Sequence, residues 1–121
     1  NENDVLIGLA ASGNTPFTCE VLKYSRSKKA LIIAISNNPD GKILKYANLK
    51  IILNTKEEVI AGSTRLKAGT TQKVCLNIIS SLVMVKMGKV RNGLMINLVP
   101  SNIKLKKRKK MIDQHSKKKD F

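Results

Sequence analysis

The stretch Val5-Leu6-Ile7-Gly8-Leu9-Ala10-Ala11-Ser12-Gly13-Asn14-Thr15-Pro16 decides the fold of this 121-residue chain. Its first half is a continuous apolar run that ends in small and polar residues, as a buried parallel strand does. Pro16 suits the first turn of a helix, because the N–H at that position has no partner in a helix anyway. The stretch therefore predicts a buried strand that turns into a helix.

The alternation of strand and helix continues along the chain. We expect strands at 30–36 and 49–53, and helices at about 17–29, 43–47 and from Ser63 or Arg65 to Met87. Gly88 is expected to end the long helix, and Asn92-Gly93 to form a turn. Lys50 indicates a strand at a sheet edge. Strands that alternate with helices predict an α/β fold with a parallel sheet and right-handed crossovers.

The predicted sheet is incomplete. Only three strands are recognisable, although the first reads as fully buried, so we expect further strands from upstream or from another chain. The chain starts at Asn1 rather than Met, directly before an apolar strand, which hints that something upstream is missing. The expected fold class is an incomplete α/β three-layer sandwich with about three strands and a long C-terminal helix.

Positive charge is unevenly distributed along the chain. The formal net charge is +15. Residues 104–121 hold nine Lys or Arg against Asp113 and Asp120, a net charge of +7, which leaves +8 on the body. We therefore expect a domain over residues 1–103, able to take an anionic ligand, and a basic, flexible tail over 104–121. The tail could bind nucleic acid or an anionic surface. Residues from Lys104 onward could be helical, but the density of like charge favours a solvated, frayed tail. No aromatic residues are interleaved for base stacking, so a tail without a partner is favoured.

Other features narrow the compartment and the chemistry. Cys19 and Cys75 lie in apolar helical stretches, as small buried hydrophobes do, and no signal peptide opens the chain, so a reducing, cytoplasmic compartment is expected. Residues 74–87 are too short and too polar for a membrane span and predict a buried helix. The single His115 makes a metal site or a catalytic triad unexpected, and no cofactor is predicted.

The first candidate site is the loop Ser12-Gly13-Asn14-Thr15. Ligands of open α/β sheets bind at the carboxyl ends of strands, and a helix start there offers free N–H groups and partial positive charge to a phosphate. The loop is neither a Walker motif nor a dinucleotide fingerprint. The alternative is that Ser12 or Thr15 simply caps the helix. The pattern leaves both interpretations open.

The second candidate site is the segment from Glu58 to Lys73, which follows the third strand and so lies on the same rim of the sheet. Glu58 could bind sugar hydroxyls or move a proton. Ser63, Thr64 and Lys67 could donate to an anion. The alternative is that Ser63 caps the following helix and that the charges are solvated.

Together these segments resemble a known family. Residues 7–17 (IGLAASGNTPF) and 58–77 (EVIAGSTRLKAGTTQKVCLN) are similar to the sugar isomerase (SIS) domain of N-acetylmuramic acid 6-phosphate etherases, and GSTRLKAGT is the more specific part. The resemblance covers roughly residues 4–105 and continues through Gly88-Lys89-Val90, Leu94-Met95-Ile96 and Ser101-Asn102 followed by Lys104-Leu105. The mammalian glucokinase regulator shares this domain type but matches less closely.

The resemblance implies a flavodoxin-like fold and a cytoplasmic lyase of peptidoglycan recycling and amino sugar catabolism. Such enzymes cleave the lactyl ether to N-acetylglucosamine 6-phosphate and D-lactate, by elimination and water addition, without a metal and usually as homodimers. It also implies that Ser12, Gly13, Asn14 and Thr15 hold the phosphate. Glu58 and residues 63–67, among them Ser63, Thr64 and Lys67, would line the sugar site.

Several departures limit what the resemblance implies. Asn14 replaces the family's usual Arg, and Arg91-Asn92-Gly93 replaces an aromatic-glycine-asparagine stretch. The Lys-rich tail replaces a helical extension, and the family's two catalytic glutamates lie upstream of the matched part. We therefore expect the C-terminal portion of the domain, assembled as a homodimer or with the missing N-terminal portion. It would bind the sugar phosphate but not catalyse alone, with Glu58 as its one catalytic candidate. The alternative is a non-catalytic sugar-phosphate regulator.

Overall fold

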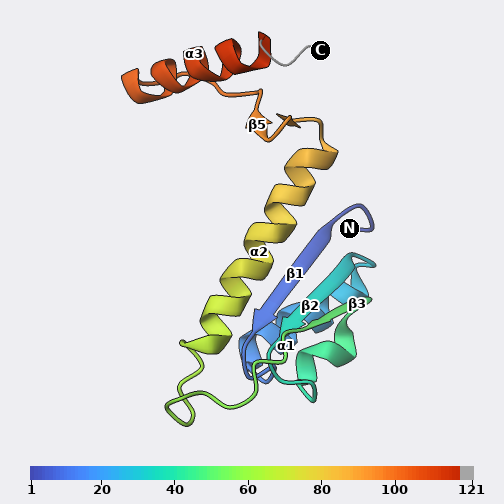
Figure 1. The fold of residues 1–121 in the computed structure, drawn as a ribbon. Helices are drawn as coiled ribbons and strands as arrows, with labels where there is room; N and C mark the ends of the chain where they lie inside the picture. Colours follow the sequence, from blue (N-terminus) through green and yellow to red (C-terminus); the bar gives the residue numbers. More distant parts are fainter. Residues whose placement is uncertain (118–121) are drawn as a thin grey trace. The chain divides into compact units, whose positions relative to one another are not determined.

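The computed structural model describes residues 1–117 (Figure 1). The chain falls into two compact units, Asn1–Leu76 and Asn77–Phe121, and the division lies within helix α2 (Lys67–Lys86). The predicted boundary between a domain and a tail at residue 104 stays a prediction. The last four residues of that tail, 118–121, lie outside the described residues.

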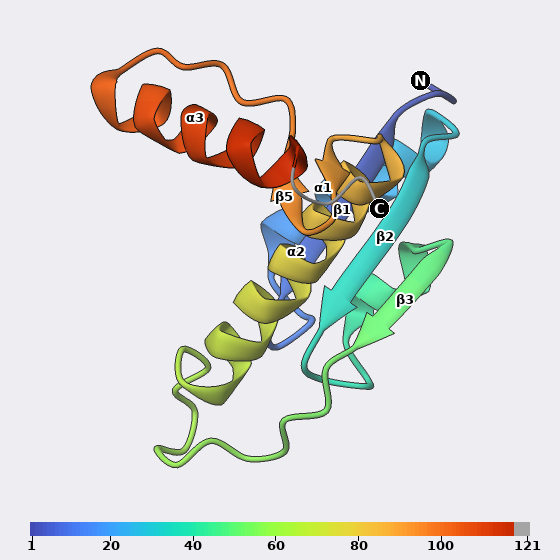
Figure 2. The same ribbon diagram turned by 45° about the horizontal axis from the view of Figure 1, so that its top comes forward.

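The first unit is built on a parallel sheet. Its strands are β1 (Val5–Ala10), β2 (Leu31–Ser36) and β3 (Leu49–Ile52), in the order β1-β2-β3. Helix α1 (Pro16–Ser27) connects β1 to β2, and the short 3₁₀ helix η1 (Lys42–Tyr46) connects β2 to β3. Figure 2 shows β2 and β3 running in the same direction. The predicted α/β fold class with three parallel strands is confirmed.

The core of this unit lies between the sheet and the pair α1 and η1. Leu22, Ile32 and Ile43, one from each of α1, β2 and η1, are fully buried in it. Gly8 makes room for Leu22, because a Cβ on Gly8 would lie 2.7 Å from the Leu22 Cδ2. Close packing of aliphatic side chains therefore fixes α1 over β1 and β2 and sets where α1 starts at the rim of the sheet.

The prediction that β1 is fully buried is wrong for the described residues. Val5 and Ile7 are 58% and 38% exposed. Within residues 1–117, β1 pairs only with β2, so it is an edge strand. Alternate residues of a strand point to opposite faces, so Val5 and Ile7 lie on the face opposite Gly8 and the core. Lys50 lies on β3, the other edge, as predicted.

Helix α2 starts later than predicted and ends as predicted. The Glu58 carboxylate accepts hydrogen bonds from the first free amides of the helix, those of Lys67 and Ala68. At its end, Gly88 has a φ of +67° and donates to the Val85 carbonyl, while Lys89 donates to that of Met84. These two bonds form a Schellman motif, for which a glycine is favoured.

The expectation of a buried helix at residues 74–87 is wrong within the described part of the chain. Leu82 and Met87, for example, are 56% and 60% exposed. Among residues 1–117, no helix has both the length and the apolar character that crossing a membrane requires. Cys19 is buried and Cys75 partly buried, and both are free thiols.

The second unit contains a hairpin and a helix. β4 (Val90–Arg91) and β5 (Leu94–Met95) pair antiparallel. Asn92 and Gly93 between them both have positive φ, as a type I′ turn requires. The predicted frayed tail is instead helix α3 (Ile103–Lys117). The Asn102 side chain accepts the Leu105 amide at 2.9 Å, and this cap starts the helix despite the dense positive charge.

Candidate functional site

The first loop, residues 11–15, closes on itself through short polar contacts. The Gly13 amide donates to the Ala10 carbonyl at 3.0 Å. The Ser12 hydroxyl accepts the Asn14 amide at 3.2 Å, and the Asn14 Nδ2 donates to the Ser12 carbonyl at 3.1 Å. Asn14 therefore shapes the loop with its own side chain. Ser12 and Thr15 remain exposed at the rim.

Gly13 brings this loop against the loop that follows β2. It has a φ of +70°, and a Cβ there would lie 2.4 Å from the Gly41 Cα. The Gly13 carbonyl accepts the Ile43 amide at 3.0 Å, and the Asn14 Oδ1 accepts the Lys42 amide at 3.2 Å. The close backbone approach at Gly13 is thus made with Gly41, within the protein.

Helix α1 starts at this loop without a side-chain cap. Thr15 occupies the N-cap position, but its hydroxyl makes no hydrogen bond to the helix. Pro16 has no N–H, so Phe17 and Thr18 carry the first-turn amides that lack an intrahelical acceptor. Neither Ser12 nor Thr15 acts as the cap of α1. The partial positive charge of the helix start therefore faces the rim.

Glu58 caps the other helix that starts at this rim. Its two carboxylate oxygens accept the Lys67 amide at 2.8 Å and the Ala68 amide at 3.0 Å. The hydrogen bond from Ala68 is the main cause that lowers the pKa of Glu58 below its usual value, and Lys67 contributes. A carboxylate held in this way is a weaker proton acceptor. Its predicted role toward a sugar stays a prediction.

Ser63 and Thr64 lie in the turn before α2. The Ser63 amide donates to the Ile60 carbonyl at 3.0 Å, but neither hydroxyl makes a hydrogen bond within residues 1–117. The alternative that Ser63 caps the helix is wrong, because Glu58 takes that place. Both hydroxyls thus stay open to an external partner, and their predicted contact with a ligand stays a prediction.

Asn37, at the carboxyl end of β2, joins the segments of the rim, and sequence reasoning missed it. Its Nδ2 donates to the Leu53 carbonyl at 3.1 Å and to the Thr55 and Thr71 hydroxyls at 3.2 and 3.0 Å. Its Oδ1 accepts from the Gln72 Nε2 at 2.8 Å. The side chain thereby ties the start of α2 to the segment after β3.

The neighbouring Asn38 completes the connection. Its Nδ2 donates to the Ser12 carbonyl at 3.0 Å, and the Asn37 amide donates to the Ala11 carbonyl at 3.2 Å. The two asparagines thus link the first loop to the start of α2, so both candidate segments lie on one rim as predicted. The signal available in the sequence was the placement of Asn37 directly after a buried strand, within a stretch that reads simply as a loop.

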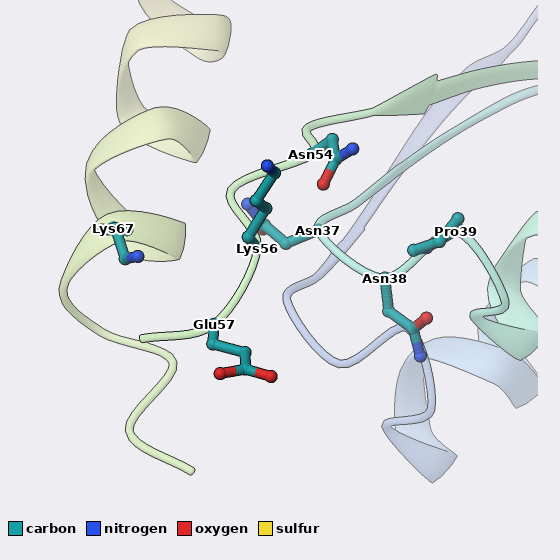
Figure 3. Close-up of a pocket in the computed structure, with 7 residues that line it drawn as sticks. All are labelled: Asn37, Asn38, Pro39, Asn54, Lys56, Glu57 and Lys67. Atoms are coloured by element: carbon teal, nitrogen blue, oxygen red, sulfur yellow. The ribbon is translucent and has the colours of Figure 1, made fainter. Parts of the chain in front are cut away.

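An open hollow of about 730 Å³ lies beside these asparagines (Figure 3). Its lining comes from the ends of β2 and β3 and the start of α2: Asn37, Asn38, Pro39, Asn54, Lys56, Glu57 and Lys67. Lys67 is the one predicted site residue in this lining. Two cations and three amide side chains against one carboxylate give the hollow a polar character that suits an anionic or hydroxylated ligand.

Metal ligands do not gather at the rim or elsewhere in the described part of the chain. Over residues 1–117, no group of three His, Cys, Asp or Glu side chains lies close enough together to hold a metal ion.

Known proteins resemble the chain at the level of both sequence and fold. Residues 1–80 match the SIS domain family. The chain is 48% identical over 112 residues to an N-acetylmuramic acid 6-phosphate etherase of Bacillus cereus, and 52% identical over 109 residues to one of Francisella philomiragia. These matches cover 93% and 90% of the chain but 38% and 37% of the relatives. The chain thus spans little more than a third of the length of these relatives.

A solved structure supports the fold alone. A crystal structure described as that of a hypothetical protein matches 73% of this chain and 50% of its own, with a TM-score of 0.59 at 17% identity. The parallel sheet, the sequence match over residues 1–80 and the etherase relatives agree. The chain therefore belongs to the SIS domain family.

Proposed function

We propose that this chain is the sugar-phosphate-binding portion of an N-acetylmuramic acid 6-phosphate etherase. The observation that carries the proposal is the uncapped start of α1 at the loop Ser12–Thr15. Side chains often cap helix starts, whereas this one presents its free amides at the rim where α/β sheets bind ligands. The names of the relatives supply the ligand class.

A phosphate group matches what this loop offers. The Phe17 and Thr18 amides and the helix dipole favour a dianion, and the Ser12 and Thr15 hydroxyls are exposed for further donation. Asn14 acts indirectly, since its side chain is already bonded to Ser12 and Lys42. In this assignment the sugar extends from the phosphate toward Ser63, Thr64 and Lys67.

The complete reaction needs more than this chain provides. Elimination of the lactyl ether requires a base for the carbon acid and an acid for the leaving oxygen. Glu58 is a single carboxylate that already caps α2. We assign the proton transfers to the part of the relatives that this chain does not span. Release of N-acetylglucosamine 6-phosphate and D-lactate is therefore a property of the whole enzyme.

The capped state of Glu58 also favours a second candidate. A protein that binds the sugar phosphate without converting it would need the same loop and no base. Incubation of the chain with N-acetylmuramic acid 6-phosphate, followed by an assay for D-lactate, tests the prediction that both candidates share. No D-lactate is expected from this chain alone. D-lactate released by this chain would overturn both the assignment of the protons to the missing part and the non-catalytic candidate.

Ligand binding itself is tested by thermal unfolding. N-acetylglucosamine 6-phosphate at ten times its Kd should stabilise the chain by about 1.4 kcal/mol, because only the folded state binds it. Unphosphorylated N-acetylglucosamine should give no shift at the same concentration. Ser12→Ala should reduce the shift, whereas Ser27→Ala, which removes an exposed hydroxyl at the far end of α1, should preserve it. Equal shifts for both sugars would contradict a phosphate site.

A further inference from the structure

Helix α3 carries a dense group of cations that the proposed function does not use. Six of the seven positions 104–110 are basic: Lys104, Lys106, Lys107, Arg108, Lys109 and Lys110. All six side chains are exposed. Among residues 1–117, none of them lies within ion-pair distance of a carboxylate. We call these six residues the α3 basic cluster.

These charges oppose the helix that carries them. The first turn of α3 contains no acidic residue, and Lys104 and Lys106 lie near the positive end of the helix dipole. Residues three and four apart are neighbours on a helix, so Lys104 meets Lys107 and Arg108 with like charge. The Asn102 cap holds the helix start against this repulsion. A ligand with closely spaced negative charges would remove the repulsion.

A membrane surface fits α3 poorly. At about 3.6 residues per turn, the cations of the cluster fall on all sides of the helix rather than on one face. Leu105 and Ile112 form only a narrow apolar strip, and both are partly buried already. Helices that lie in a membrane interface need a broad apolar face opposite the charged one.

A single-stranded nucleic acid also fits poorly. Such strands are held by aromatic side chains on which the bases stack. The described part of the second unit, residues 77–117, contains no Phe, Tyr or Trp. The lack of aromatic residues led to the prediction of a solvated tail without a partner. It does not argue against binding of a duplex, because the phosphates of a duplex are bound by charge alone.

We propose that the α3 basic cluster binds the phosphate backbone of a double-stranded nucleic acid. Residues 104–110 extend over about 9 Å of helix, and a duplex presents one charge per about 1.7 Å when both strands are counted, so about five phosphates of the two strands flank this length of a helix that lies in the groove. An α-helix is also narrow enough for a major groove about 12 Å wide. Lysine presents a point charge, so binding is independent of base sequence.

The test is the binding of a fluorescent 20-base-pair duplex to the 121-residue chain, measured by anisotropy between 50 and 200 mM salt. About five phosphate contacts predict a slope of log K against log salt of about −4.5, which is a loss of 10²- to 10³-fold over this range. Replacing all six cations of the cluster by Gln, a good helix former, should abolish this binding and its salt dependence while helix content by circular dichroism persists.

A matched control removes the same charge from the first unit. It replaces six exposed lysines by Gln: Lys23, Lys28, Lys29, Lys45, Lys50 and Lys73. This variant should keep the affinity within about threefold. Equal losses in the two variants, no binding of the duplex, or tighter binding of a single strand or of phosphatidylserine vesicles would each overturn the proposal. The sugar-phosphate assignment is unaffected by any of these outcomes, because it rests on other residues.

Discussion

Gly13 is the residue with the least freedom at the candidate site. Its φ is +70°, and a Cβ would lie 2.4 Å from the Gly41 Cα and 2.8 Å from the Ser36 Oγ. Gly13→Ala should therefore combine the left-handed penalty of about 1–2 kcal/mol with overpacking of about 1–3 kcal/mol. We expect a loss of about 2–5 kcal/mol in the free energy of unfolding by urea.

Gly62 provides the control for that substitution. It has a φ of +78°, but nothing lies within 4 Å of a Cβ built there. Gly62→Ala should cost about 1–2 kcal/mol, the backbone penalty alone. If Gly13→Ala costs no more than Gly62→Ala, the two loops are not as tightly docked as described.

Glu58 makes the stability of α2 depend on pH. Its carboxylate is favoured in the folded state, because the amides of Ala68 and Lys67 lower its pKa. The stabilisation is present at pH values above the ordinary pKa of a glutamate and is lost as pH falls through the lowered value. Glu58→Gln should destabilise the chain at pH 7, and the gap to wild type should close on acidification.

Unfolding curves of Glu58→Gln at a series of pH values from 7 to 3 measure this gap. Glu57→Gln serves as the control, because the adjacent Glu57 is exposed and makes no hydrogen bond within the described residues. It should leave unfolding at pH 7 nearly unchanged. A gap for Glu58→Gln that stays constant down to pH 3 would contradict the role of the ionised carboxylate as the cap.

The role of a residue was predictable from the sequence where it depends on residues close to it along the chain. Gly88 and the Asn92-Gly93 turn follow from local backbone conformation, and both are confirmed. Asn37 acts on partners 16 to 35 positions away, and Glu58 caps amides nine and ten positions away. No local pattern encodes such contacts, because they depend on how the strands place the loops.

At the scale of elements, the start of α2 depends on Asn37. Four side-chain hydrogen bonds join this residue to the segment after β3 and to the first turns of α2. Net contributions of about 0.5–1.5 kcal/mol per bond predict that Asn37→Ala costs about 2–6 kcal/mol. Amide hydrogen exchange should speed up most in residues 67–72, with less change in β1.

Asn54→Ala is the control for this element. Asn54 lines the same hollow and is exposed, and its side chain makes no hydrogen bond within residues 1–117. It should leave exchange in residues 67–72 unchanged. Uniform acceleration across the whole first unit in Asn37→Ala would show that this residue supports the core rather than the start of α2.

The sequence predicts whether a segment forms a helix or a strand better than it predicts whether that segment is buried. Strands β1 to β3, α1 and α2 lie close to their expected positions, because apolar period and glycine placement encode them. The continuous apolar run of β1 predicted that the strand is fully buried. Burial depends on which elements cover the strand, and the sequence of the strand itself does not specify them. For residues 103–117, the dense positive charge predicted a frayed tail. The structure instead has helix α3, whose start is capped by the Asn102 side chain.

At the scale of the whole molecule, the first unit carries the candidate site and the second carries the basic cluster. The rim combines an uncapped helix start at Ser12–Thr15, a capped one at Lys67 and the two asparagines that join them. The homodimer, or assembly with further strands, that the sequence predicts stays a prediction. Within residues 1–117, β1 is an edge strand with exposed Val5 and Ile7.

The most direct test of the sugar-phosphate site is an amide NMR titration of the chain with N-acetylglucosamine 6-phosphate. We predict saturable shifts centred on Ser12, Phe17 and Thr18, which inorganic phosphate reproduces in part and unphosphorylated N-acetylglucosamine does not. Ser12→Ala should weaken the titration. The absence of shifts at this loop at millimolar ligand, or shifts confined to α3, would contradict the assignment.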